Sequence, residues 1–186
     1  MSEMRLVITS LPSAVRLLKY KPQKDHPHWM VSIGDVGDRV PPLERLQPTE
    51  ARTLRLTFSD VNRRYWYGGA FLEPPTHGDV AKIIDFADQV KAHLREEQWK
   101  TWSTKTVPVL LVHCAMGISR STGTALVILA RLMGPGRELE ACQIVKDARR
   151  QAAPNGLLVT LGDQMLGREG ALLHAAGKTF ERCGGG

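Results

Sequence analysis

The segment VHCAMGISRS, residues 112–121, places a thiol and a guanidinium on one short loop. Cys114 ends an apolar run, and Arg120 follows it after five residues. A loop between a strand and a helix can point successive backbone N–H groups into one concavity, where the helix dipole adds positive potential. Such a concavity fits the oxygens of a phosphoryl group. We therefore predict a phosphate-binding loop made of Ala115, Met116, Gly117, Ile118, Ser119 and Arg120.

The side chains of this loop suit phosphoryl transfer. The positive surroundings favour the thiolate of Cys114, which is a strong nucleophile. Gly117 permits a positive φ, and the planar guanidinium of Arg120 can bind two phosphate oxygens at once, which a lysine cannot do. Ser121 is placed to donate a hydrogen bond to the sulfur. His113, whose side chain alternates away from that of Cys114, is expected to orient the loop through hydrogen bonds and not to act as a base.

The residues around this loop alternate between strand-like and helix-like patterns. Apolar residues predict strands at 4–9, 29–33, 54–58 and 107–114. Helical patterns follow Ser10 or Ser13 and recur at 76–95, 121–133, 138–151 and 157–167, while 34–49 and 61–75 are predicted to be irregular. This alternation predicts an α/β fold, a three-layer sandwich with a central, mostly parallel sheet of about 4–5 strands flanked by helices.

Length and charge limit the class of protein. The 186 residues, 42% of them hydrophobic, suffice for one sizeable core, so we expect a single domain over 1–186 with a flexible tail at about 177–186. The net charge of +6 favours anionic partners. The longest basic runs are pairs, at 63–64 and 149–150, so nucleic-acid binding is disfavoured.

Cysteine content and hydropathy indicate a reducing compartment. The three cysteines cannot all pair in disulfides, and no apolar run approaches the roughly 18 residues of a membrane-spanning helix. We expect a cytoplasmic monomer with no membrane partner, metal or other cofactor. Cys142, in a predicted amphipathic helix, and Cys183 are expected to be structural thiols.

The loop residues together resemble a known signature. His113, Cys114, Gly117, Ser119, Arg120 and Ser121 stand as they do in the cysteine-dependent protein tyrosine phosphatases, in the compact dual-specificity branch. The segment ARRQAAPNGLLVTLGDQMLG, residues 148–167, is similar to the arginine-rich helix and Pro-Asn pair that follow this loop in that branch, most of all in small bacterial members. The resemblance covers about 54–167, the expected catalytic core.

The resemblance implies a fold, an activity and supporting residues. The fold would be that of protein tyrosine phosphatases, and the reaction would be hydrolysis of phosphotyrosine, or also of phosphoserine and phosphothreonine, through a phosphocysteine on Cys114. The substrate would be a phosphorylated protein or peptide. Asn155 would support the loop.

A general acid is expected upstream, on a loop between a strand and the helix that precedes the nucleophile's strand. Asp60, just beyond the third predicted strand, fits that place. Asp79 is the competitor, but Thr76 and Asp79 have the spacing of a helix-capping box. We therefore favour Asp60.

Segment 63–67, RRYWY, has two open interpretations. Arg63 and Arg64, beside the expected acid and followed by Gly68 and Gly69, could contact a phosphorylated substrate or belong to a lid. Ordinary packing of a surface loop explains the segment equally well.

Three other functions share this anion loop. A phosphatase of phosphoinositides or nucleic acids would use the same chemistry, but Ala115, Met116 and Ile118 are uncharged where lipid-directed relatives often carry lysines. A phosphate-binding module without turnover would have no need of Cys114 and Asp60. Sulfur transfer or arsenate reduction fits the trailing Ser121 and the Pro-Asn segment less well.

Overall fold

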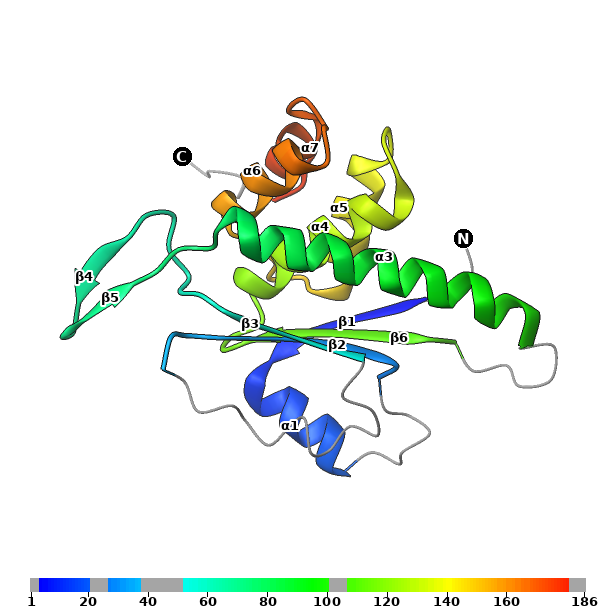
Figure 1. Ribbon diagram of the computed structural model, residues 1–186, viewed down its shortest axis with the longest axis horizontal. Coiled ribbons are helices and arrows are strands. Elements are labelled where there is room, and N and C mark those ends of the chain that lie inside the picture. The colour runs from blue at the N-terminus through cyan, green and yellow to red at the C-terminus, as the bar shows by residue number, and fades with distance from the viewer. Residues whose placement is uncertain (1–3, 21–26, 38–51, 101–106, 181–186) are drawn as a thin grey trace.

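The computed structural model describes residues 4–20, 27–37, 52–100 and 107–180, with the backbone alone for 96–100. Its centre is a parallel four-stranded sheet in the order β1-β6-β2-β3. The strands are β1 (Arg5–Ser10), β6 (Val109–Cys114), β2 (Trp29–Gly34) and β3 (Thr53–Thr57). Figure 1 shows one helix, α1 (Leu11–Tyr20), on one face of the sheet and the remaining helices on the other. The predicted three-layer α/β fold is confirmed.

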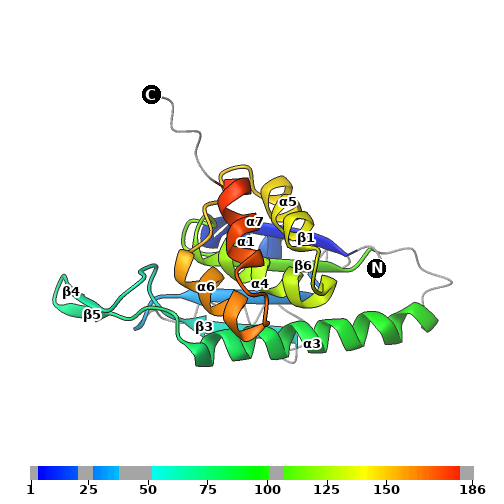
Figure 2. The ribbon, with the colours of Figure 1, turned by 90° about the horizontal axis from the view of Figure 1, so that it is seen from above.

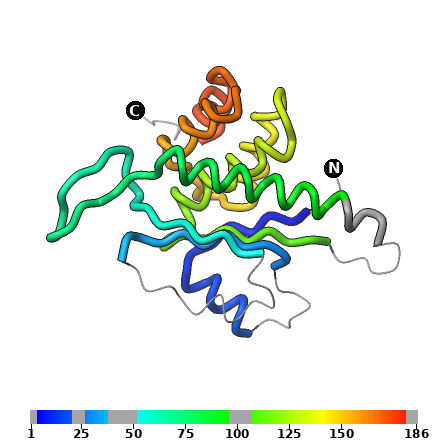
Figure 3. The backbone as a smooth tube through the Cα atoms, in the orientation of Figure 1, coloured from blue at the N-terminus to red at the C-terminus, as the bar shows by residue number. Residues whose placement is uncertain are grey.

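Five of the described helices form the thicker layer. They are α3 (His77–Lys100), α4 (Arg120–Met133), α5 (Glu138–Ala148), α6 (Gly156–Met165) and α7 (Ala171–Phe180). Seen from the helical side (Figure 2), α3 runs along the β3 edge of the sheet, and α5 and α7 lie toward β1. Figure 2 also places α4 between them, and the backbone trace in Figure 3 follows the chain from the end of β6 up into this helical layer. The helix that carries Arg120 is therefore at the centre of the layer.

The central strand β6 divides its side chains between two cores. Val112 and Cys114 face the large core beneath α4, whereas Leu111 packs with Met30 and with Leu18 of α1 on the other face. Alternate residues of a strand point to opposite faces, so a strand covered on both sides must be apolar throughout. This explains the uninterrupted run VLLVHC, whose residues are all buried.

Because the sheet is parallel, its carboxyl ends meet at one edge. β6 ends at Cys114, β2 is followed by Asp35, and β3 is followed by the segment that leads to Asp60. Ligand sites in open parallel sheets form at this edge. The fold thus brings together three polar side chains that are far apart in the sequence.

The segment predicted to be irregular, 61–75, contains a β-hairpin. Its strands, β4 (Tyr65–Tyr67) and β5 (Ala70–Leu72), pair in antiparallel fashion and project from the body of the protein, as Figure 1 shows. Gly68 and Gly69 form the turn with φ of 60° and 86°. Two positive φ angles are what a tight hairpin turn requires, so this Gly-Gly pair between aromatic runs was an available signal.

Two further boundaries differ from the prediction. α3 continues to Lys100 instead of ending near Arg95. Residues 177–180 form the last turn of α7 and pack in the protein, so the expected tail at 177–186 is wrong for these residues; 181–186 lie outside the described residues. Within the described ranges, none of the helices has the length and apolar character needed to cross a membrane.

Helices α4 and α6 are packed closely enough that glycine is needed at their contact. A Cβ on Gly123 of α4 would lie 3.2 Å from Leu158, and one on Gly162 of α6 would lie 2.5 Å from Val127 Cγ2. This approach brings the start of α6, including Asn155, against the start of α4, where Asn155 N donates to Ser119 O at 3.2 Å.

We predict that Gly162→Ala lowers the free energy of unfolding by about 1–3 kcal/mol, because the added methyl overlaps the fixed side chain of Val127. Urea unfolding measures the effect. Gly156→Ala is the matched control on the same helix, since a Cβ there meets nothing within 4 Å. Equal stability of the two variants would contradict the close packing of α4 and α6.

Candidate active site

The loop from Cys114 to Arg120 is held in a tight curve by Gly117. Its φ is 69°, a conformation that side chains oppose, and a Cβ there would overlap the carbonyl carbon and oxygen of Thr9 and lie 2.6 Å from Ser10 N. The loop therefore rests directly on the end of β1. The sequence predicted the positive φ, but the contact with β1 depends on the order of the strands.

The backbone carbonyls of the loop bind donors that lie outside it. Four of these hydrogen bonds come from segments other than the helix that follows the loop: Leu11 N to Ala115 O at 3.2 Å, Arg149 Nη2 to Met116 O at 3.2 Å, Ala153 N to Ile118 O at 3.0 Å, and Asn155 N to Ser119 O at 3.2 Å. A peptide's N–H points away from its C=O, so this arrangement turns N–H groups toward the centre of the loop. Arg149, one of the basic pair at 149–150, therefore braces the loop.

The sulfur of Cys114 lies inside this curve. Gly117 N donates to Sγ at 3.2 Å, and Ser121 Oγ lies 3.3 Å from Sγ. Burial opposes ionisation of the thiol, but hydrogen bonds from the Ser121 hydroxyl and from backbone N–H groups of the loop outweigh it, so the pKa of Cys114 is lowered. The predicted neighbourhood of Cys114 and Ser121 is present.

The guanidinium of Arg120 is buried and partly paired. Its Nη1 donates to Phe58 O at 2.8 Å and lies 3.1 Å from Asp35 Oδ1, while Nη2 donates to Asp35 Oδ2 at 3.2 Å. The buried Nε has no hydrogen-bond partner among the described residues. Because a buried N–H without an acceptor is unfavourable, this donor fits an anionic ligand in the loop.

Asp35 is a site residue that the sequence analysis missed. It was assigned to a loop that begins at Gly34 and received no role. Its carboxylate makes a two-pronged ion pair with Arg120, which fixes the plane of the guanidinium. The available signal was its position immediately after a buried parallel strand, the same signal that identified Asp60.

Asp60 reaches the loop from the end of β3. Its Oδ1 accepts hydrogen bonds from Ser119 Oγ at 2.6 Å and from Asn155 Nδ2 at 2.9 Å. Asn155 Oδ1 in turn accepts from Leu158 N at 3.0 Å and caps α6. One asparagine thus ties the aspartate, the loop and a helix start together.

Asp79 lies in a capping box and away from these contacts. Its Oδ2 accepts from Thr76 N at 3.0 Å and from Thr76 Oγ1 at 2.7 Å, while Asp79 N donates to Thr76 Oγ1 at 3.2 Å. These bonds satisfy the free N–H groups at the start of α3. The structure therefore brings Asp60 to the loop and uses Asp79 at a helix end.

His113 does not make the hydrogen bonds that were expected of it. Both ring nitrogens are buried, and neither makes a hydrogen bond of ordinary geometry within the described part of the chain. Burial lowers the pKa of His113 to about 4, and the charge of Arg55 acts in the same direction. The ring is therefore a neutral, packed group on the face of β6 opposite Cys114.

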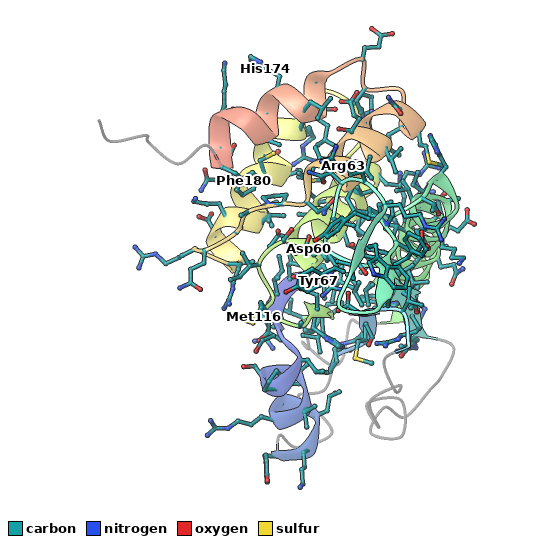
Figure 4. All side chains as sticks on the ribbon, turned by 90° about the vertical axis from the view of Figure 1, so that its left-hand side faces the viewer. Asp60, Arg63, Tyr67, Met116, His174 and Phe180 are labelled. Atoms are coloured by element: carbon teal, nitrogen blue, oxygen red, sulfur yellow. The ribbon has the colours of Figure 1, made fainter. Side chains whose placement is uncertain are left out.

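The two arginines of the hairpin segment differ in their contacts. Arg64 Nε lies 2.7 Å from Glu73 Oε1, and its guanidinium stands 4.0 Å from the ring centre of Phe71. No described residue pairs with Arg63, which lies near Asp60. In Figure 4, Met116, Asp60 and Arg63 follow one another along the face from which the hairpin projects.

We predict that Ser121→Ala moves the pH midpoint of iodoacetate alkylation of Cys114 upward, because the thiolate loses a hydrogen bond. Peptide mapping by mass spectrometry separates the two buried thiols. Cys142 is the internal control: burial raises its pKa to about 11, so its alkylation at neutral pH should stay slow in both proteins. An unchanged midpoint would show that Ser121 does not stabilise the thiolate.

Comparison with known proteins supplies structural likeness but no sequence match. No family model and no curated protein matches the sequence. Among the solved structures that share the fold, PTP-2 phosphatase of Cydia pomonella is 20% identical to this chain, with a TM-score of 0.53, and the match covers 88% of this chain and 87% of that chain. Human DUSP28 is 18% identical, with a TM-score of 0.53, and the match covers 89% of this chain and 94% of DUSP28. DUSP15 is 18% identical, with a TM-score of 0.52, and the match covers 99% of this chain and 96% of DUSP15.

These likenesses agree with the residues around Cys114. The likeness extends over 87%, 94% and 96% of the three matched chains, so it concerns the whole fold and not a single part of it. Within the described residues, no group of three or more His, Cys, Asp or Glu side chains is placed to hold a metal ion. The chain therefore has the fold of the cysteine-dependent protein tyrosine phosphatases, in the compact form of the dual-specificity phosphatases.

Proposed function

We propose that the protein is a phosphatase that hydrolyses phosphotyrosine, and also phosphoserine or phosphothreonine, in protein substrates through a phosphocysteine on Cys114. One observation carries the proposal. A cysteine with a lowered pKa lies inside a curve of backbone N–H groups, with the unpartnered, buried Nε of Arg120 on the same loop. These are the groups that a phosphoryl transfer to sulfur requires.

In the first step, the thiolate of Cys114 attacks phosphorus and the bond from phosphorus to the leaving oxygen breaks. The loop N–H groups and Arg120 stabilise the charge on the equatorial phosphoryl oxygens. Asp60, in its protonated form, gives its proton to the leaving oxygen, so that a neutral hydroxyl departs. Asp35 keeps the guanidinium oriented without touching the substrate.

In the second step, water attacks the phosphocysteine and the bond from phosphorus to sulfur breaks. The carboxylate of Asp60, left ionised by the first step, accepts the proton of the water. The hydroxyl of Ser121, 3.3 Å from Sγ, donates to the departing thiolate. Phosphate leaves, and both Asp60 and Cys114 regain their starting forms.

The surroundings of the loop favour a protein substrate in a reducing compartment. Ala115, Met116 and Ile118 are uncharged, whereas an inositol phosphate would gain from additional cations there. Cys114 and Cys142 are both free thiols. We propose a cytoplasmic location on this ground.

A phosphate-binding module without turnover is the second candidate. One matched structure is named human tyrosine phosphatase-like serine/threonine/tyrosine-interacting protein, 20% identical with a TM-score of 0.53. The presence of Cys114, Ser121 and Asp60 at bonding distances around one loop favours catalysis over binding alone.

We predict that the protein hydrolyses p-nitrophenyl phosphate and that Cys114→Ser abolishes this activity while retaining binding of a phosphotyrosine peptide. The serine hydroxyl keeps the size of the thiol but is a far weaker nucleophile at neutral pH. Nitrophenol release and calorimetric titration are the measurements. Cys142→Ala, which alters a buried thiol of the core, should remain active.

Two results would contradict this proposal. If Cys114→Ser were nearly as active as the parent protein, Cys114 could not be the nucleophile. A parent protein that binds the phosphopeptide without hydrolysing any aryl phosphate would instead be a binding module.

We predict that Asp60→Asn lowers kcat by about 10²- to 10⁴-fold for phenyl phosphate, which has a poor leaving group, and much less for an aryl phosphate whose phenol is strongly acidic. Asp79→Asn should lose only helix stability, about 0.3–1 kcal/mol, because the negative charge at the start of α3 is removed. Steady-state rates over a series of aryl phosphates measure the difference. A loss that is uniform across the series, or larger for Asp79→Asn, would move the acid role away from Asp60.

A further inference from the structure

The chain between Asp60 and the hairpin is anchored at several points. Asp60 is bound by Ser119 and Asn155, and the carbonyl Oδ1 of Asn62 accepts from Leu157 N, at the start of α6, at 3.3 Å. At the base of the hairpin, Ser59 N donates to Glu73 O at 2.7 Å. Arg63, which follows Asn62 directly, therefore extends from a fixed stretch of backbone and not from a free loop.

Arg63 lines a hollow on the surface next to these anchors. The hollow measures about 480 Å³ and is lined by Val61, Asn62, Arg63 and Tyr65. Its wall thus combines an aliphatic side chain, an amide, a guanidinium and an aromatic ring. That combination suits a side chain with an apolar stem and a carboxylate at its end.

Within the described part of the chain, no carboxylate neutralises the charge of Arg63. The neighbouring Arg64 has Glu73 as its partner, but none of the described carboxylates pairs with Arg63. The nearest acidic residue in the chain, Asp60, already accepts two hydrogen bonds from other residues. The hollow is therefore a cationic site beside the proposed reaction centre.

Arg63 is close enough to the proposed reaction centre for a single bound peptide to reach both. Arg63 and Asp60 are three residues apart in the chain, so their Cα atoms lie at most about 11 Å from each other. An extended peptide advances about 3.3 Å per residue. A residue within about three positions of a phosphotyrosine held in the loop can thus reach the hollow.

We propose that Arg63 binds the carboxylate of a glutamate or aspartate that flanks the phosphotyrosine, so that the protein selects acidic phosphopeptides. This inference rests on the proposed function, because the phosphotyrosine must be held in the loop of Cys114. Arg64 has a different task, since its ion pair with Glu73 and its contact with Phe71 stabilise the hairpin.

A membrane surface is the competing partner for this region. Trp66 and Tyr67 are 61% and 70% exposed on the projecting hairpin, and aromatic rings near arginines also occur in proteins that bind lipid interfaces. The hollow, however, is lined by residues at the base of the hairpin, whereas a lipid surface would contact the projecting strands. We therefore favour the peptide.

The test measures binding in the Cys114→Ser protein, which needs no turnover. Fluorescent phosphotyrosine peptides carry either glutamate or glutamine at each flanking position, and anisotropy gives the Kd of each. We expect glutamate to tighten binding about fivefold at one or more positions, as an exposed bidentate ion pair does, and the preference to shrink at high salt. Adding Arg63→Gln should bring the ratio of the two Kd values to about one, and Arg63→Lys should retain part of it.

Arg5→Gln is the matched control. It removes the same charge from an exposed arginine at the amino end of β1, the edge of the sheet opposite the loop. The ratio of the two Kd values should keep its parental value in this variant. Because each ratio is formed within one protein, a general loss of stability does not imitate the effect.

Several results would overturn the inference. The first is a ratio of the two Kd values that is the same with and without Arg63. The second is a ratio of about one in the Cys114→Ser protein that retains Arg63. The third is a failure of that protein to bind any phosphopeptide. Loss of binding to vesicles that contain anionic lipid in Arg63→Gln, without an effect on peptides, would assign the arginine to a membrane. If the charge preference is present but the protein with an intact Cys114 hydrolyses no aryl phosphate, the proposed function fails and the inference about Arg63 stands.

Discussion

The carbonyls of the 114–120 loop must be hydrogen-bonded from outside the loop, and much of the structure serves to supply those donors. A tight loop can turn its N–H groups inward only if its carbonyls find donors on the outside. Those donors come from the start of α1, from the end of α5 and from the segment before α6. The loop's support therefore depends on segments that are distant in sequence, and only the packing of the whole domain brings them to it.

The site also balances charge. Arg120 is buried, and an unpaired buried cation would be unfavourable, so Asp35 and the carbonyl of Phe58 share its guanidinium. The pairing leaves Nε available. The same site favours a thiolate at Cys114 through fixed dipoles and a hydroxyl, which need no reorganisation when an anion arrives.

The two sides of the site differ in their construction. On the side of Asp60, the 61–75 segment adds a projecting hairpin and Arg63, an arginine with no carboxylate partner among the described residues, to the compact core. Cation–π and aromatic contacts within the hairpin, such as that of Trp66 with Phe71, stabilise a two-stranded ribbon that has no large core of its own. A substrate bound in the loop would meet this side next, so selectivity is expected to lie here.

Much of the fold followed from local patterns. The apolar runs and the spacing of residues from His113 to Ser121 indicated the parallel sheet, the curved 114–120 loop and the helix after it, because these features depend on residues adjacent in the chain. The capping box of Asp79 followed for the same reason. The partnership of Arg120 with Asp35 and the bracing of the loop by Arg149 were decided by the tertiary structure alone. They join residues whose proximity depends on strand order and helix packing, and a linear pattern carries no record of which strand lies beside which.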